Sequence, residues 1–176
     1  MSLNNDVINV ILERKSVRKY LDKPVEKDKL ELLLKSAMAA PSAVNHQPWV
    51  FVVVDDREIL NEMAHNLPYA KMLLTAPLAI VICGDIDKAL TDWEQDFWIQ
   101  DCSAATENLL IAVEALGLGA VWTALYPADD RVKVVKDALN MPHNLMPLNV
   151  IPIGYPAGHD APTDKWKPEN IHYNKW

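Results

Sequence analysis

Glycine is scarce in this sequence, with five residues among 176. Gly117 and Gly119 lack the third glycine of a dinucleotide-binding fingerprint, and they follow a predicted helix where the fingerprint would follow a strand. The sequence also contains no P-loop, no Gly-x-Ser-x-Gly elbow and no His-Glu-x-x-His motif. A dinucleotide-binding domain of the Rossmann type is therefore not expected.

Cysteine is equally sparse. Cys83 and Cys102 lie far apart on predicted buried elements and form no Cys-x-x-Cys pair, which is typical of reduced core residues in a cytoplasmic protein. The five histidines are scattered without the spacing of metal ligands. We therefore expect neither a disulfide framework nor a protein metal site.

Positive charge is in the minority, with 17 lysine and arginine residues against 24 aspartate and glutamate residues. A net charge of −7 argues against a nucleic-acid or anionic-membrane surface, although a local basic cluster can still hold one phosphate. No apolar run is long enough to span a bilayer, and residues 1–10 lack the blocks of a signal peptide. We expect one cytoplasmic domain over residues 1–176.

The hydrophobic pattern predicts helices and strands in irregular alternation. The first expected helix begins at Asp6, and four more cover residues 25–39, 57–65, 99–116 and 131–139. The expected strands cover residues 49–54, 78–83, 120–124 and 148–153. Because strict βαβ regularity is absent, we expect an α+β fold rather than a doubly wound sheet. On the first helix, the expected buried side consists of Val7, Ile8, Ile11 and Leu12.

Two segments carry aromatic side chains. The first either covers a ligand or belongs to the core, and its aromatic residues are Trp93, Phe97 and Trp98. The second is the proline-containing tail from Tyr155 to Trp176, which should run extended. It holds too much aromatic surface for a solvated tail, in Trp166, Tyr173 and Trp176. We expect this tail to lie docked, with a second subunit as a candidate surface.

The stretch from Pro41 to Trp49 joins a predicted helix to a predicted strand and is dense in polar side chains. Its prolines restrict the backbone, so the connection should be stiff. Hydroxyl and amide groups on Ser42, Asn45 and Gln47 suit a ligand rich in hydroxyls and ring heteroatoms. An ordinary helix-to-strand turn explains the same residues equally well.

A basic cluster at the end of the first helix contains Arg14, Lys15, Arg18 and Lys19 together with Ser16. Cations near a helix C-terminus complement the helix dipole, and this ordinary explanation is the stronger one on sequence alone. The same side chains also offer charge, and a bidentate guanidinium fork, to a phosphate.

Together, the Arg14-to-Arg18 element and the Pro41-to-Trp49 element resemble the nitroreductase family of FMN-dependent oxidoreductases. The similarity continues through Gly117 to Leu125 and into Gly154-Tyr155-Pro156. The resemblance implies a nitroreductase-like α+β fold, with a central, mostly antiparallel sheet flanked by helices and a C-terminal tail extended over a dimer partner. It also implies non-covalent FMN at the interface of a homodimer.

The resemblance further implies which residues contact FMN. The phosphate and ribityl chain would be held by Arg14, Lys15, Ser16 and Arg18, with Lys15 standing where many relatives have arginine. The ribityl chain and flavin ring would be lined, often from the partner subunit, by Pro41, Ser42, Asn45 and Gln47. Backbone N–H groups would face the N5 and O4 edge of the flavin from Trp122, Thr123, Ala124 and Leu125. The tail would add Lys165 and Lys167 beside the phosphate.

The function implied is ping-pong transfer of electrons from NAD(P)H through flavin N5 to a small, electron-poor acceptor of the nitroaromatic or quinone type. The cofactor carries the chemistry, so no side chain is expected as general acid or base. Neither a nucleic acid nor a membrane is expected as partner. Two alternatives stay open: a flavin-binding redox sensor or reservoir without turnover, and a homologue that has lost FMN.

Overall fold

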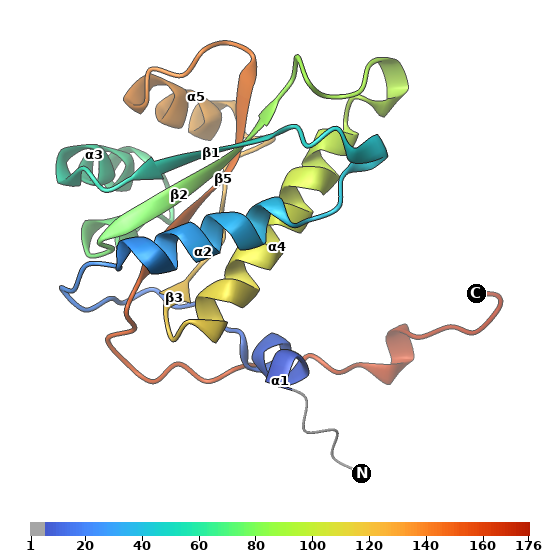
Figure 1. Cartoon of the computed structure of the whole chain (residues 1–176), viewed down its shortest axis with the longest axis horizontal. Coiled ribbons are helices and arrows are strands. Elements are labelled where there is room, and N and C mark those ends of the chain that lie inside the picture. The colour runs from blue at the N-terminus through green and yellow to red at the C-terminus, as the bar shows by residue number, and fades with distance from the viewer. Residues whose placement is uncertain (1–5) are drawn as a thin grey trace.

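The computed structural model describes residues 6–176 and is built around a five-stranded antiparallel sheet. The strand order is β1 (Trp49–Val54), β2 (Leu78–Asp85), β5 (Leu145–Gly154) and β3 (Gly119–Ala120), and β4 (Thr123–Ala124) also pairs with β5. Helices flank this sheet, which confirms the expected α+β fold (Figure 1).

Five α-helices surround the sheet over the described residues. They are α1 (Asp6–Glu13), α2 (Lys27–Met38), α3 (Arg57–Asn66), α4 (Phe97–Ala115) and α5 (Asp129–Ala138). Short 3₁₀ turns occupy Ala43–Asn45, Lys71–Leu74, Asp92–Glu94 and Pro168–Asn170. The last α-helix begins two residues earlier than predicted, so Asp129 and Asp130 lie in its first turn rather than before it and complement the helix dipole there.

Strand β2 is buried along its whole length and separates two cores. Successive side chains of a strand point to opposite faces. Ile80 and Ile82 accordingly pack with α2 and α4, whereas Ala79 and Val81 pack with α3 and α5. Helices therefore cover both faces of the sheet.

The long helix α4 ends in a glycine cap. Gly117 has φ of 69°, and its N–H donates to the Glu114 carbonyl while the Leu118 N–H donates to the Val113 carbonyl, both at 3.0 Å. This is the Schellman arrangement, and the buried Leu118 and Val113 supply its usual apolar contact. The chain is thereby turned directly into β3.

The predicted strand over residues 120–124 is interrupted in the structure. β3 and β4 keep one register against β5, with Ala120 opposite Ile153 and Thr123 opposite Val150. That register sets Pro152 opposite Val121, and proline has no N–H to donate to the ladder. The break therefore leaves the backbone at 121–122 free to bend at the sheet edge.

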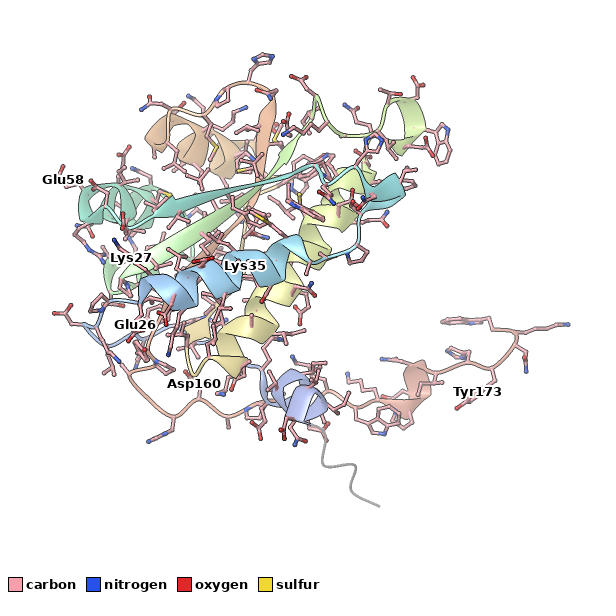
Figure 2. The ribbon with its side chains drawn as sticks, viewed as in Figure 1. Glu26, Lys27, Lys35, Glu58, Asp160 and Tyr173 are labelled. Carbon is pink, nitrogen blue, oxygen red and sulfur yellow. The ribbon has the colours of Figure 1, made fainter. Side chains whose placement is uncertain are left out.

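Two predictions of burial fail within the single chain. The apolar side of α1 is exposed at Val7, Ile8, Ile11 and Leu12. The tail is exposed from Ala157 onward and carries Tyr173 away from the body of the chain (Figure 2). Both segments lie at the periphery of the sheet and its helices, where Ile11 and Leu12 of α1 line a common cleft with Trp166 of the tail. Over the described residues, no helix combines the length and apolar character needed to cross a membrane.

Candidate functional site

The segment after α1 is docked on the sheet edge, which fixes the basic residues beside α4. The Val17 N–H donates to the Ala120 carbonyl at 2.8 Å, and a Cβ on Gly119 would lie 2.7 Å from the Val17 side chain. The buried Tyr20 hydroxyl donates to the carbonyls of Val17 (2.7 Å) and Pro152 (3.1 Å). Burial raises the pKa of the Tyr20 phenol, which keeps it a donor.

Two of the basic residues are tied to α4 by ion pairs. Arg14 Nε lies 3.3 Å from Glu107 Oε1, and Lys15 Nζ lies 2.7 Å from Glu114 Oε1. Arg18 forms no salt bridge with any residue in the described range 6–176. The pairs orient Arg14 and Lys15, while the charge of Arg18 is left for a ligand.

A polar cleft of about 360 Å³ opens among these residues. It brings together five of the predicted phosphate-binding residues, namely Arg14, Lys15, Ser16, Arg18 and Lys165, with Asp160, Ala161 and Thr163 completing its lining. The tail reaches it because the Ala157 N–H donates to the Lys19 carbonyl at 2.9 Å. Lys167 does not line this cleft, since it precedes the 3₁₀ turn at 168–170 farther along the tail.

A narrower cleft of about 150 Å³ adjoins the first and also contains Arg18. Trp122, Thr123 and Ala124 line it, beside the interrupted edge of the sheet. The Thr123 hydroxyl is buried and has no hydrogen-bond partner within the described chain. An unpaired buried hydroxyl is costly unless a partner such as an ordered water satisfies it.

Leu125 differs from its three predecessors. Its side chain is 1% exposed and packs in the core beneath α5, and its N–H donates to the Leu148 carbonyl at 2.9 Å. The amide is therefore already paired. Leu125 supports the strand edge from behind.

The Pro41–Trp49 loop is strained and internally bonded. Val44, Asn45 and Gln47 have φ of 48°, 60° and 50°, a left-handed region that non-glycine residues rarely adopt. The Ser42 hydroxyl accepts the Gln47 N–H at 2.9 Å, and the Asn45 amide oxygen accepts from Gln47 Nε2 at 3.0 Å. Such strain persists where surrounding structure enforces it, often at ligand sites.

The loop is anchored at the N-terminal part of α4. The buried carboxylate of Asp101 accepts the Ala43 N–H at 2.8 Å. The basic cleft is anchored farther along α4, through Glu107 in the middle of the helix and Glu114 near its C-terminal end. These anchors lie six and thirteen residues from Asp101 on the helix, about 9 Å and 20 Å away at 1.5 Å per residue. One chain therefore places its loop and its basic cleft at separate positions along α4.

The chain matches the model of the nitroreductase family over residues 11–67 and 60–155. It belongs to that family. A protein of Methanothermobacter thermautotrophicus named "Putative NADH dehydrogenase/NAD(P)H nitroreductase" is 42% identical over 171 residues, covering 97% of this chain and 88% of that protein. A crystal structure of the same description from Parabacteroides distasonis superposes with a TM-score of 0.94 at 49% identity, covering 98% and 100% of the two chains.

A third nitroreductase-family relative carries a cofactor in its name. The FMN-dependent nitroreductase of Clostridium difficile has a TM-score of 0.88 at 31% identity, covering 96% of this chain and 99% of that chain. The similarity extends over nearly the full length of both proteins, so the clefts described above lie inside the shared fold.

The aromatic residues before and within α4 have different environments. Trp98 is buried, its ring fills the space that a side chain on Gly84 would need, and it packs edge-to-face on Tyr126 with ring centroids 5.1 Å apart. Trp98 is therefore a core residue. Trp93 is 80% exposed and meets Phe97 edge-to-face at 6.0 Å. Only Trp93 and Phe97 remain available to cover a ligand.

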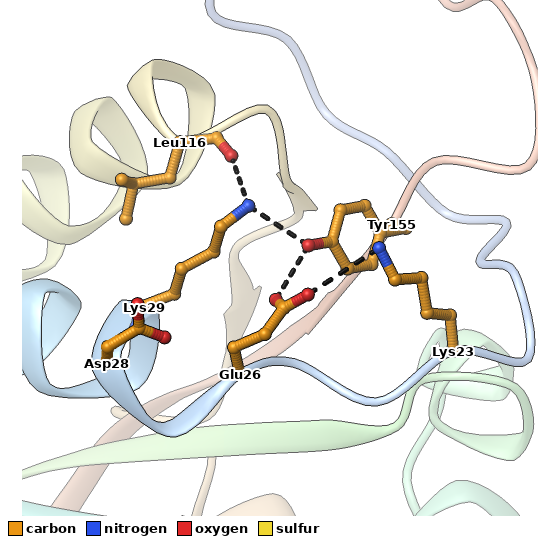
Figure 3. A network of polar contacts seen from close by, with 6 residues as sticks. All are labelled: Lys23, Glu26, Asp28, Lys29, Leu116 and Tyr155. Carbon is orange, nitrogen blue, oxygen red and sulfur yellow. Dashed lines mark hydrogen bonds and ion pairs between the residues drawn. The ribbon is translucent and has the colours of Figure 1, made fainter.

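A polar network secures the point where the tail leaves β5 (Figure 3). The Tyr155 hydroxyl donates to Glu26 Oε2 at 2.6 Å and accepts from Lys29 Nζ at 3.0 Å. Lys29 also donates to the Leu116 carbonyl at 3.0 Å, and Lys23 Nζ lies 3.6 Å from the Tyr155 ring centroid. The network joins α2, the end of α4 and the start of the tail that carries Lys165.

Sequence reasoning missed several residues that line these clefts. Asp160 and Thr163 lie in the tail, and Tyr69 and Arg131 line the cleft beside Trp122. None belongs to a sequence motif, and each reaches its cleft only through the tertiary fold. Asp101 could have been recognised from the sequence, because it lies on an otherwise apolar helix face and a buried carboxylate needs a hydrogen-bond partner.

Proposed function

We propose that this chain binds FMN non-covalently and transfers electrons from NAD(P)H to a small, electron-poor acceptor of the nitroaromatic or quinone type. The chain is an NAD(P)H-dependent flavin oxidoreductase of the nitroreductase family. The observation that carries the cofactor assignment is the pair of adjoining clefts that share Arg18, one lined by cations and the other by residues 121–124 at the sheet edge.

The residues present fit FMN. A phosphate carries close to two negative charges and accepts charge-assisted hydrogen bonds, which suits Arg14, Lys15, Arg18 and Lys165 in the polar cleft. Ser16 adds a hydroxyl at the same place. The neighbouring cleft, lined by Trp122, Thr123 and Ala124 with no carboxylate, suits the uncharged ring. Lys167 stays a weaker proposal because it lies outside the cleft.

The loop residues are proposed to serve the partner subunit. Pro41, Ser42, Asn45 and Gln47 contact a different part of α4 from their own basic cleft, and none of them lines it, so we assign them to the flavin of a second copy. Exposed apolar side chains on α1, α2 and the tail support a homodimer, because such surface is uncommon on a monomer. They include Ile8, Leu12, Leu32, Met38, Trp166 and Trp176.

Within this proposal, each part of the chain has a physical task. Bound FMN supplies hydride acceptance from the donor and electron delivery to the acceptor. Arg18, between the two clefts, stabilises negative charge there. The strained loop holds its amides in place, so little ordering is needed when a ligand binds. Donor and acceptor use the same open pocket in turn, which gives ping-pong kinetics.

The test is an anaerobic absorbance titration of the FMN-loaded protein with NADH and NADPH, followed by a panel of nitroaromatic and quinone acceptors. We expect bleaching by at least one nicotinamide and recovery of the yellow colour with an acceptor. A colourless protein that takes up no added FMN would refute the cofactor assignment. A yellow protein that neither nicotinamide bleaches would favour a redox sensor or reservoir.

A further inference from the structure

A third cleft, of about 480 Å³, opens beside the narrow one. Its lining consists of Arg18, Lys19, Tyr69, Lys71, Met72 and Thr75. Three of these residues, Arg18, Tyr69 and Met72, also line the cleft next to Trp122. A ligand whose reacting end lies in the narrow cleft can therefore extend along the surface into the wide one.

The two adjoining clefts are positively charged in an acidic protein. Arg18, Lys19, Lys71 and Arg131 line them, whereas no aspartate or glutamate does. None of these four cations forms a salt bridge within residues 6–176, although the chain as a whole carries a net charge of −7. Unneutralised cations around a concave surface attract anionic ligands.

Tyr69 gives the rim of these clefts a flat aromatic surface. Its side chain is 81% exposed, and its φ of 61° is one that a bulky residue rarely adopts. The Arg131 guanidinium lies 6.0 Å from the ring centroid and donates to the Ala124 carbonyl at 3.4 Å. An exposed ring held in a strained conformation beside a cation is suited to stack a planar ligand.

We propose that Lys19, Tyr69, Lys71 and Arg131, the outer rim, bind the adenosine diphosphate half of the nicotinamide dinucleotide and favour the form with a 2′-phosphate. This rests on the proposed function, because the nicotinamide must reach the flavin at Trp122–Ala124. The pyrophosphate and adenosine then occupy the wide cleft. The cations bind the phosphates and the Tyr69 ring stacks on adenine. A 2′-phosphate adds close to two further negative charges at neutral pH.

The decisive probe is 2′-phospho-ADP-ribose, which lacks the nicotinamide and undergoes no redox reaction. Calorimetry on the FMN-loaded protein should show binding to wild type and at least tenfold weaker binding to the Lys19→Gln/Arg131→Gln variant. Lys133→Gln is the matched control, since Lys133 lies on the same helix as Arg131 but pairs with Asp137 at 2.6 Å. ADP-ribose should bind wild type more weakly than its 2′-phosphate form.

Tyr69 is tested separately with two variants. Asn tolerates a left-handed backbone, so Tyr69→Asn removes the ring without adding strain, while Tyr69→Phe keeps the ring. We expect the first to raise KM for NADPH about tenfold, roughly the loss of one base-stacking contact, and the second to stay within twofold of wild type. Both variants are saturated with FMN before the kinetics, because Tyr69 also lines the cleft beside Trp122.

Two results would overturn the outer rim as a dinucleotide site. One is equal binding of the probe by wild type and the Lys19→Gln/Arg131→Gln variant, and the other is no binding to wild type. Failure of the proposed function looks different, because it is an FMN-loaded protein that no nicotinamide bleaches. Loss of probe binding in the double variant would support the rim even in that case.

Discussion

Two candidate ligand-binding surfaces contact helix α4 and differ in kind. Along its middle and C-terminal part, the basic cleft is built from charged side chains that ion pairs hold on the helix, as Arg14 with Glu107 and Lys15 with Glu114. At the N-terminal part, the Pro41–Trp49 loop is neutral, has three left-handed non-glycine residues and is tied down through Asp101. One surface offers charge and the other offers fixed hydrogen-bond geometry.

The difference gives the two surfaces complementary tasks in the proposed function. Charge attracts a phosphate but does not orient a ring, whereas a stiff set of amides orients a ring but adds little attraction. Within a chain, the anchors of the cleft lie about 9 Å and 20 Å along the helix from the anchor of the loop. In the proposed homodimer, the cleft of one chain would meet the loop of the other.

The largest expected effect comes from removing charge at the basic cleft. The Arg14→Ala/Arg18→Ala variant should bind FMN at least about 100-fold more weakly, because each charge-assisted hydrogen bond contributes about 1.5–3 kcal/mol. Fluorescence-quenching titration measures the affinity, and thermal unfolding should show a folded chain. Lys35→Ala/Lys133→Ala is the control, since both lysines form exposed helical pairs. Unchanged FMN affinity would refute the phosphate assignment.

Mixing two defective proteins tests whether the halves come from different chains. The first is the Arg14→Ala/Arg18→Ala variant, and the second carries Ser42→Ala, Asn45→Gly and Gln47→Gly, where glycine keeps the positive φ. Refolding an equal mixture should restore about a quarter of the FMN sites, because half the dimers are mixed and each has one intact site.

Either protein refolded alone is the control for that mixture and should bind almost no FMN. Absence of recovery in the mixture, with mixed dimers shown to form by mass spectrometry, would mean that one chain supplies both halves. Recovery of all FMN sites would also contradict a site shared between two chains, because that model leaves only a quarter of the sites intact.

A smaller effect is expected from loosening the loop. Asp101→Leu removes the acceptor of the Ala43 N–H, and leaving that buried group unpaired should cost about 1–3 kcal/mol of unfolding free energy. FMN affinity should fall about tenfold because the loop must be ordered on binding. Denaturant unfolding and FMN titration measure the two losses. Asp101→Asn, which keeps an acceptor oxygen, should lie close to wild type, and equal losses in both variants would contradict this role.

The smallest effect concerns pH and the Tyr155 network. The hydrogen bond from Tyr155 lowers the pKa of Glu26 below its ordinary 4.5, so this stabilisation is present above pH 4.5 and is lost as pH falls through the lowered value. The hydrogen bond to Tyr155 raises the pKa of Lys29 above 10.5, so its stabilisation is lost only as pH rises through the raised value. In the Tyr155→Phe variant, the thermal unfolding midpoint should depend less on pH at low and at high pH than it does in the control variant Tyr173→Phe. Identical pH profiles would show that the network contributes nothing.

Local signals predicted the elements on which the site is built. The run Trp49–Val54 is a strand with the predicted bounds, because six apolar residues after a proline favour extended backbone. Gly117 ends α4 as predicted, since a left-handed cap requires glycine. The break at residues 121–122 was not predicted, because it depends on Pro152 of another strand. The single-domain organisation and cytoplasmic location stay predictions.

The sequence predicted the residues of each motif in the candidate site, but it did not predict how the motifs come together. Arg14, Ser16 and Arg18 stand in one short motif, so their proximity follows from sequence. The contribution of Lys165 was implied only by family resemblance, and the structure places it in the cleft because backbone bonds guide the tail past Lys19. Leu125 belonged to the predicted set, yet its amide is paired with Leu148.

The sequence by itself determined the family, the helices and strands, and the chemical types gathered at each motif, because these depend on local patterns of residues. Only the tertiary structure decided which motifs meet. The fold places the tail beside the basic cleft, and it holds the Pro41–Trp49 loop against a different part of α4. It also brings Tyr69 and Arg131 beside Trp122. The physical reason is that these contacts join residues distant in sequence, and their positions depend on how helices pack across one shared sheet.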